Sequence, residues 1–250
     1  MEKFKQDLDI KLIALDMDGT LLNDEREISL ANRQAIRDVQ EKGIYVVLST
    51  GRSILKCRHH AKSLELSSYL VTVNGSEIWD DKEDLVERKI VQPVDIQFMW
   101  ELSKQHKLKF WAISTSQNWH NEMPEDIHSV DWLKFGFYVD DHNTKELIIN
   151  TLQKKNIFEI SNSHPKNIEV NALGINKANG LKTVCSKLGI QMEQVMAIGD
   201  SQNDLAMIQE AGIGVAMGNA QEIVKKAADW VTNTNNEDGV ALAIRKWVLY

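Results

Sequence analysis

Two aspartates directly follow a short apolar run near the start of the chain. The run 12–15 has the composition of a buried strand; Asp16 and Asp18 come next, and Gly19 and Thr20 follow them. Aspartate is a poor strand former, and two carboxylates beside a buried strand carry a desolvation cost unless another group compensates their charge. A metal ion could supply that compensation if a third carboxylate lay nearby in the fold. The alternative is an Asp-Gly turn that simply ends a strand.

Polar clusters also follow two other predicted strands. Ser49-Thr50-Gly51-Arg52 comes after the apolar run 44–48, and Gly199-Asp200-Ser201-Gln202-Asn203-Asp204 comes after the run 195–198. Lys177 stands at the start of a predicted helix between them. Because ligands bind at the carboxyl ends of the strands in open parallel sheets, we expect these clusters to converge on one edge. Carboxylates, a hydroxyl group, a lysine and glycine-containing turns are together suited to binding a hard cation and a phosphate.

The order of elements predicts the sheet that would position these clusters. Runs of strand length at 12–15, 44–48 and 69–73 alternate with stretches of helical periodicity at 30–43 and 53–66. The same alternation resumes after Lys177 and continues to the closing helix. Such an order is typical of a parallel sheet with crossover helices. We therefore predict an α/β fold with a doubly wound parallel sheet.

The stretch 76–172 has a different character. It begins with a predicted hairpin, contains predicted helices at 93–106 and 144–154, and includes a polar part, 114–130, for which no element is predicted. This mixture is typical of an α+β unit. We predict a discontinuous core of residues 1–75 and 173–250 with the α+β unit inserted at 76–172.

Composition narrows the range of partners. The chain has 250 residues, 43% of them hydrophobic, and a formal net charge of −7. This charge argues against nucleic acid as a partner, since a protein that binds the phosphate backbone needs a basic face. No apolar run is long enough to cross a bilayer, and the charged segment 1–9 lacks the apolar region of a secretory signal. Two distant cysteines, Cys57 and Cys185, indicate no disulfide framework, so we expect a cytoplasmic protein.

The four polar motifs together resemble those of the haloacid dehalogenase superfamily. The motifs occur in the same order and are Asp16-Met17-Asp18-Gly19-Thr20, Ser49-Thr50-Gly51-Arg52, Lys177 and Gly199-Asp200-Ser201-Gln202-Asn203-Asp204. The Thr-Gly-Arg form of the second motif, the pair Asn74-Gly75 and an insertion between the second and third motifs are similar to the Cof-type phosphatases. The resemblance implies a Rossmann-like core with an inserted cap that closes over the active site and selects the leaving group.

The resemblance also implies a role for each acidic residue. Asp16 would be the nucleophile that forms an aspartyl-phosphate, and Asp18 would be the general acid and base. Mg²⁺ would be held by the Asp16 carboxylate, the Asp18 backbone carbonyl and Asp200, an all-oxygen set suited to that ion. We expect Asp204 to cap the helix that follows and to support the metal site without binding the ion, because the spacing from Ser201 fits a capping box.

The remaining motif residues would hold the phosphate. The resemblance implies that Thr50, the backbone amides of Met17 and Gly51, Lys177 and Asn203 surround the transferring oxygens. Lys177 could instead be a solvated helix residue. However, a cation is slightly unfavourable in the first turn of a helix, which indicates an anionic partner.

The resemblance implies a Mg²⁺-dependent phosphatase of small phosphorylated metabolites. A phosphomutase or phosphotransferase acting on a sugar phosphate, and a non-catalytic regulator that binds phosphometabolites, are the alternatives. Sugar phosphates, a flavin-pathway phosphate, pyridoxal phosphate and a small phosphoacid all remain open as substrates, and so does the oligomeric state. In the cap, Trp119 and His120 are the candidate substrate contacts, although most tryptophans in such a unit pack its own core.

Overall fold

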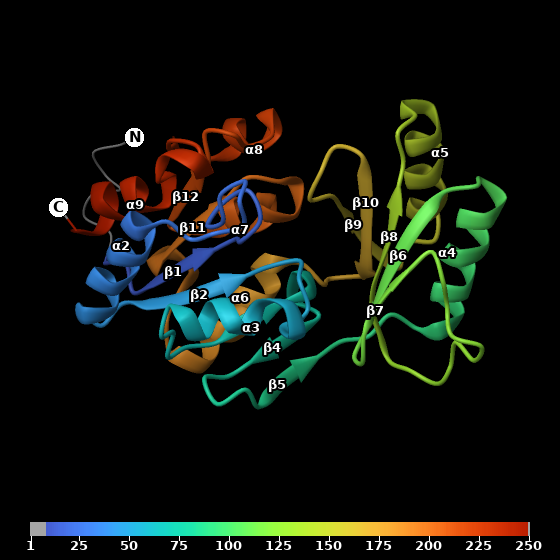
Figure 1. Cartoon of the computed structure of the whole chain (residues 1–250), viewed down its shortest axis with the longest axis horizontal. Helices are drawn as coiled ribbons and strands as arrows, with labels where there is room; N and C mark the ends of the chain where they lie inside the picture. The colour runs from blue at the N-terminus through green and yellow to red at the C-terminus, as the bar shows by residue number, and fades with distance from the viewer. Residues whose placement is uncertain (1–8, 250) are drawn as a thin grey trace.

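The protein consists of a core lobe and a cap lobe, each built on its own sheet (Figure 1). The computed structural model describes residues 9–249, so most of the N-terminal segment in which we expect no secretory signal lies outside the described residues. None of the helices in the described part is long and apolar enough to span a membrane.

The core sheet has eight strands in the order β13-β12-β11-β1-β2-β3-β4-β5. The first six in this order run parallel, and β4 and β5 are antiparallel to their neighbours. The strands are β1 (Leu12–Leu15), β2 (Tyr45–Ser49), β3 (Leu70–Thr72), β4 (Glu77–Trp79), β5 (Leu85–Arg88), β11 (Val195–Gly199), β12 (Ile213–Ala216) and β13 (Trp230–Val231). The predicted parallel α/β sheet is confirmed.

Helices with an apolar face cover this sheet. They are α2 (Leu30–Glu41), α3 (Ile54–Ser63), α6 (Lys177–Leu188), α7 (Leu205–Glu210), α8 (Glu222–Ala227) and α9 (Gly239–Ile244). Helix α2 packs against α9, and α6 packs against α7. The sequence explains how α2 starts, because Ser29 accepts a hydrogen bond from the Asn32 amide as its N-cap.

The central strand fixes the position of the functional edge. All four residues of β1 are buried, and its last residue, Leu15, lies in register with Leu48 of β2 and Ile198 of β11. The segments that follow these three strands therefore leave the sheet at the same edge. This register brings the first, second and fourth motifs together.

The cap lobe is a five-stranded antiparallel sheet with two helices. The strand order is β7-β6-β8-β10-β9, and the elements are α4 (Pro93–Gln105), β6 (Lys109–Ser114), β7 (Asn118–His120), β8 (Trp132–Tyr138), α5 (His142–Gln153), β9 (Phe158–Ser161) and β10 (Asn167–Ala172). Strand β7 lies in the polar part for which no element is predicted. Phe135 and Phe137 of β8 pack into the cap core, so alternation turns Lys134 and Gly136 towards the opposite face.

The hairpin at the start of the inserted stretch belongs to the core sheet. The sequence assigns it to the α+β unit, whereas in the structure Leu70, Val71 and Thr72 pair with Trp79, Ile78 and Glu77. The sequence pattern of a hairpin does not specify which sheet edge it joins, so the sequence does not reveal this pairing. The division of the chain at residues 76–172 stays a prediction, and this pairing favours a first boundary after Arg88.

Candidate active site

A buried lysine joins two aspartates at the functional edge. Lys177 is the first residue of α6, whose N-cap is Asn176, and its Nζ lies 2.5 Å from Asp16 Oδ1 and 2.6 Å from Asp204 Oδ1. Burial alone would lower the pKa of Lys177, but the two carboxylates outweigh it and raise this pKa. Lys177 is therefore not a solvated helix residue, and its ammonium group neutralises part of the charge of these two carboxylates.

Asp204 has hydrogen-bond partners on both of its oxygens. Oδ1 accepts from Lys177, and Oδ2 accepts from the backbone amides of Asp200 and Ser201 at 2.9 Å each. The backbone approaches closely here, since a Cβ on Gly199 would lie 2.5 Å from the Asp204 side chain. This arrangement caps the short 3₁₀ turn Gln202–Asp204 and holds the loop that carries Asp200.

Three carboxylates lie close together, and within residues 9–249 only one cation, Lys177, forms ion pairs with them. Oxygens of Asp16, Asp200 and Asp204 all lie within 4.8 Å of one another. With one ammonium group from Lys177, three ionised carboxylates leave a net charge of −2. Burial raises the pKa of Asp16 well above its usual value although Lys177 opposes this shift, and burial together with Asp204 raises the pKa of Asp200 to about 6.

The donor atoms fit a hard divalent cation. They are oxygens only, and the missing charge equals that of Mg²⁺. The hydroxyls of Thr20 and Ser201 donate to Asp200 at 3.1 and 2.8 Å, which orients this carboxylate. The turn that carries Thr20 also requires glycine at position 19: its φ is +82°, and a Cβ there would lie 2.7 Å from Asp200 Oδ2.

Asp18 lies at the mouth of the site and pairs with an arginine. Arg52 Nη2 lies 2.5 Å from Asp18 Oδ1, and Arg52 Nε lies 2.8 Å from Oδ2. The side chain of Asp18 is thus separate from the carboxylate cluster. This placement is compatible with a role in proton transfer and with the prediction that Asp18 offers a metal ion its backbone carbonyl.

The predicted phosphate-binding residues surround the same edge. Thr50 is buried, and its Oγ1 accepts a hydrogen bond from the Arg52 amide at 3.1 Å. Asn203 donates through Nδ2 to Asn74 Oδ1 at 3.2 Å. Met17 follows Asp16, and its side chain is buried in the core, so its backbone is the part available to the site.

A cleft of about 620 Å³ lies between the two lobes. Its core side includes Asp16, Asp18, Gly51, Arg52, Ser201 and Asn203, and its cap side includes Trp111, Asn118, His120, Lys134, Tyr138 and Glu169. Trp119 is not among the lining residues: its indole donates to Ser114 Oγ at 3.2 Å, and its ring centroid lies 6.2 Å from that of Trp132. Of the two candidate substrate contacts, His120 therefore lines the cleft and Trp119 does not.

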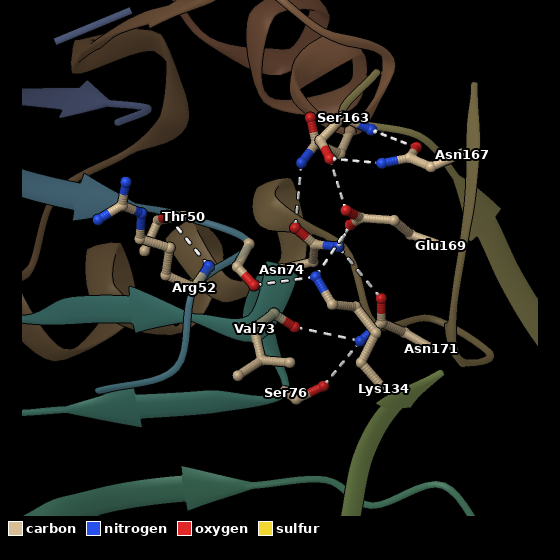
Figure 2. Close-up of polar contacts among 12 residues, drawn as sticks. Thr50, Arg52, Val73, Asn74, Ser76, Lys134, Ser163, Asn167, Glu169 and Asn171 are labelled. Carbon is tan, nitrogen blue, oxygen red and sulfur yellow. Dashed lines mark hydrogen bonds and ion pairs between the residues drawn. The ribbon is translucent and has the colours of Figure 1, made fainter. Parts of the chain in front are cut away.

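Sequence reasoning missed a polar network on the cap side of the cleft. Lys134 Nζ lies 3.0 Å from Glu169 Oε2, to which Asn74 Nδ2 also donates at 2.7 Å (Figure 2). Each residue gives a local signal by itself: Lys134 interrupts the apolar strand β8, and Glu169 stands between Ile168 and Val170 in β10. These signals do not reveal the pair, because the sequence does not show that the two strands lie side by side in one sheet.

Comparison with known proteins identifies the family. The family model for haloacid dehalogenase-like hydrolases matches residues 13–130 and 117–244. The chain belongs to this family. It is 58% identical over 245 residues to the 5-amino-6-(5-phospho-D-ribitylamino)uracil phosphatase YcsE of Bacillus subtilis, and the match covers 98% of each chain. It is 32% identical to a second Bacillus subtilis phosphatase of the same description, YitU, with 94% of this chain and 97% of the relative covered.

Solved structures agree with this assignment. A haloacid dehalogenase-like hydrolase from Bacillus subtilis matches with a TM-score of 0.87 at 26% identity, covering 94% of this chain and 99% of the other. One from Bacteroides thetaiotaomicron matches with a TM-score of 0.80 at 32% identity, covering 95% and 99%. The chain is a phosphatase of this haloacid dehalogenase-like family, with the expected core and inserted cap, and the comparisons do not favour the phosphotransferase alternative.

Proposed function

We propose that this phosphatase requires Mg²⁺ and works through a phosphorylated Asp16. The observation that carries the proposal is the position of Asp16 in the cleft, where one carboxylate oxygen is held 2.5 Å from Lys177 Nζ and Asp200 lies alongside. Lys177 orients this carboxylate and favours its ionised, nucleophilic form. A bound Mg²⁺, held by Asp16, Asp200 and the Asp18 carbonyl, would lower the repulsion between the nucleophile and an anionic substrate.

The residues at the cleft can divide the reaction into two steps. In the first, an Asp16 oxygen attacks phosphorus, the bond to the ester oxygen breaks, and Asp18 gives a proton to the leaving alcohol. In the second, water attacks the phosphorus of the aspartyl-phosphate, Asp18 accepts a proton from it, and Asp16 and inorganic phosphate are released. Thr50, the Gly51 amide and Asn203 would stabilise the charge on the transferring oxygens. Asp18 must leave Arg52 to take part.

We propose 5-amino-6-(5-phospho-D-ribitylamino)uracil as the first substrate to examine. Support comes from the relative of that description, which is 58% identical over nearly the whole chain. The cleft volume of about 620 Å³ is in the usual range for small-molecule sites. Trp111 and Tyr138, whose ring centroids lie 4.5 Å apart, give its cap side an aromatic wall that suits a planar base.

The test combines a substrate panel with one conservative variant. The wild-type enzyme should release inorganic phosphate from an aryl phosphate and, with a lower KM, from the ribitylaminouracil phosphate. Asp16→Asn and removal of Mg²⁺ should each abolish release, whereas Asp81→Asn, a change at an exposed position in the hairpin turn, should not. Turnover by Asp16→Asn would contradict the mechanism. Ligand binding without phosphate release would favour the regulator, and an isomeric phosphate product would favour the mutase.

We also propose a cytoplasmic location. Cys57 and Cys185 are both buried and unpaired, and a reducing compartment keeps thiols in this form. Localisation of a tagged chain in cell fractions tests this proposal.

A further inference from the structure

Two carbonyl groups of the loop that follows β2 are held by groups outside the loop. The Thr50 carbonyl accepts from the Asn74 amide at 2.9 Å, and the Gly51 carbonyl accepts from Lys134 Nζ at 2.9 Å. The first donor lies in the core, where Asn74 has a positive φ of 60°. The second reaches across the cleft from the cap. The conformation of this loop therefore depends on both lobes.

Holding these carbonyls determines where the loop amides point. In a trans peptide the C=O and the following N–H point in opposite directions, and the described residues contain no cis peptide. Fixing the Thr50 carbonyl thus orients the Gly51 amide. Fixing the Gly51 carbonyl orients the Arg52 amide, which donates to Thr50 Oγ1 at 3.1 Å. Because this hydroxyl oxygen already accepts a hydrogen bond, its own hydrogen can be donated to a phosphoryl oxygen.

Glu169 connects the two donors. Its Oε2 lies 3.0 Å from Lys134 Nζ and accepts from Asn74 Nδ2 at 2.7 Å, and its Oε1 accepts from Ser163 Oγ at 2.6 Å (Figure 2). The Lys134 and Glu169 side chains are only 3% and 4% exposed. Burial alone would raise the pKa of Glu169, but the charge of Lys134 and these hydrogen bonds outweigh it and hold this pKa below its usual value.

The same network includes Asn203, which is also expected to bind phosphate. Asn74 Oδ1 accepts from Asn203 Nδ2 at 3.2 Å, and the Asn203 amide donates to the Asn162 carbonyl of the cap at 3.0 Å. Hence Thr50, Gly51 and Asn203 are all tied to one cap surface.

We propose that the Lys134–Glu169 ion pair is a positioning device that sets the phosphate-binding loop when the cap lies against the core. The proposal rests on the proposed function, since it assumes that this loop binds the phosphoryl group. A buried ion pair by itself is a poor stabiliser compared with apolar side chains of similar size. Here the pair faces the cleft, and besides the bond from Ser163 its members hold Gly51 and Asn74, which is what a positioning role requires.

The kinetic test uses Lys134→Met, Glu169→Gln and the double variant with two substrates, nitrophenyl phosphate and the ribitylaminouracil phosphate. Misplacing a reacting group by about 1 Å can cost about 10²-fold in rate, so we expect kcat/KM to fall by about 10²-fold for both substrates alike. Inhibition by inorganic phosphate should weaken as well. Because the pair acts as a unit, the double variant should lose little more than either single variant.

Glu77→Gln is the matched control. Glu77 is buried and forms an ion pair with Arg88, with 2.6 Å between Arg88 Nη2 and Glu77 Oε1, but it lies in the core hairpin and does not line the cleft. This variant should lose stability in the same way and retain kcat/KM. A loss in the Lys134 and Glu169 variants that is confined to one substrate would overturn the proposal, because it would make the pair a leaving-group contact. Unchanged kinetics in folded variants would overturn it too.

A measurement without turnover separates this proposal from the proposed function. In ligand-free protein, amide hydrogen exchange followed by NMR should be faster at Arg52 in Lys134→Met than in wild type, and unchanged there in Glu77→Gln. Equal exchange in wild type and Lys134→Met would contradict the positioning role even if Asp16 proved to be the nucleophile. Conversely, an active Asp16→Asn enzyme would defeat the mechanism and leave this exchange result standing.

Discussion

Arg52 grips the Asp18 carboxylate at two points, with Nη2–Oδ1 and Nε–Oδ2 distances of 2.5 and 2.8 Å. The Asp18 side chain is 57% exposed, so solvent screens the pair and its contribution to stability is small. The contact matters more for proton transfer, because it fixes where the Asp18 side chain lies. Asp18 lies outside the carboxylate cluster and lines the cleft, so its side chain is available for proton transfer to or from a ligand there.

Asp18→Asn should separate the two halves of the reaction. With an alkyl phosphate, whose leaving alkoxide needs a proton, we expect kcat to fall about 10²–10⁴-fold without a burst. With nitrophenyl phosphate, whose leaving group needs no proton, the first step should survive and the second should not. Rapid-mixing measurements should then show a stoichiometric burst of nitrophenolate followed by slow turnover. Asp16→Asn, which lacks the nucleophile, is the control and should give no burst. An equal loss for both substrates would contradict the role of Asp18.

Lys177→Met should destabilise the fold strongly. The change leaves Asp16 and Asp204 buried without their partner, and breaking a buried ion pair in this way costs about 3–5 kcal/mol. Urea denaturation measures this free energy of unfolding. Lys182→Met on the same helix is the control: Lys182 is 48% exposed in its pair with Glu210, so its loss should cost less than about 1 kcal/mol. Equal effects of the two variants would show that Lys177 is not the neutralising group.

Mg²⁺ should stabilise the folded protein even without substrate. A ligand at 100 times its Kd adds about 2.7 kcal/mol to the free energy of unfolding, which thermal denaturation in Mg²⁺ or chelator can measure. Asp200→Asn should lose most of this increment. In chelator, however, it should be at least as stable as wild type, because it removes one charge from the crowded cluster. A wild-type Tm that does not respond to Mg²⁺ would contradict the metal site.

Glu169 should make the free energy of unfolding depend on pH in the acid range. Its pKa in the folded protein lies below the usual value, so its contribution is fully present above the unfolded-state pKa of about 4.3 and is lost as pH falls through the folded-state pKa. Glu169→Gln should therefore be less stable than wild type at neutral pH, by about 3–5 kcal/mol if Lys134 is left unpaired. The difference between the two denaturation curves should shrink below about pH 4.3. A difference independent of pH would contradict the ion pair.

The core fold and the residues at its functional edge could be predicted from the sequence, because short local patterns specify them. The apolar run 12–15, the polar residues after it and the matching clusters after β2 and β11 predict both the parallel sheet and the meeting of Asp16, Asp200 and Lys177 at its edge. Periodicity and turn chemistry specify these features without knowledge of distant contacts.

The sequence was insufficient where partners are distant in the chain. The hairpin 77–88 could have joined either lobe, and only its pairing with β3 decides the question. Trp119 and His120 are adjacent, yet strand alternation turns one towards the cap core and the other towards the cleft. Lys134 and Glu169 are separated by 35 positions, and Asn74 lies 95 positions from Glu169, so no local pattern reveals their meeting.

The contacts that set the phosphate-binding loop cross from one lobe to the other, through Lys134 to Gly51 and through Glu169 to Asn74. If the loop is set in this way, its affinity for phosphate is a property of the assembled pair of lobes and not of the core alone. When the cap moves away from the core, the loop then loses the contacts that set its conformation. Opening of the cap would therefore release inorganic phosphate by itself. No new substrate molecule would be required to displace that product.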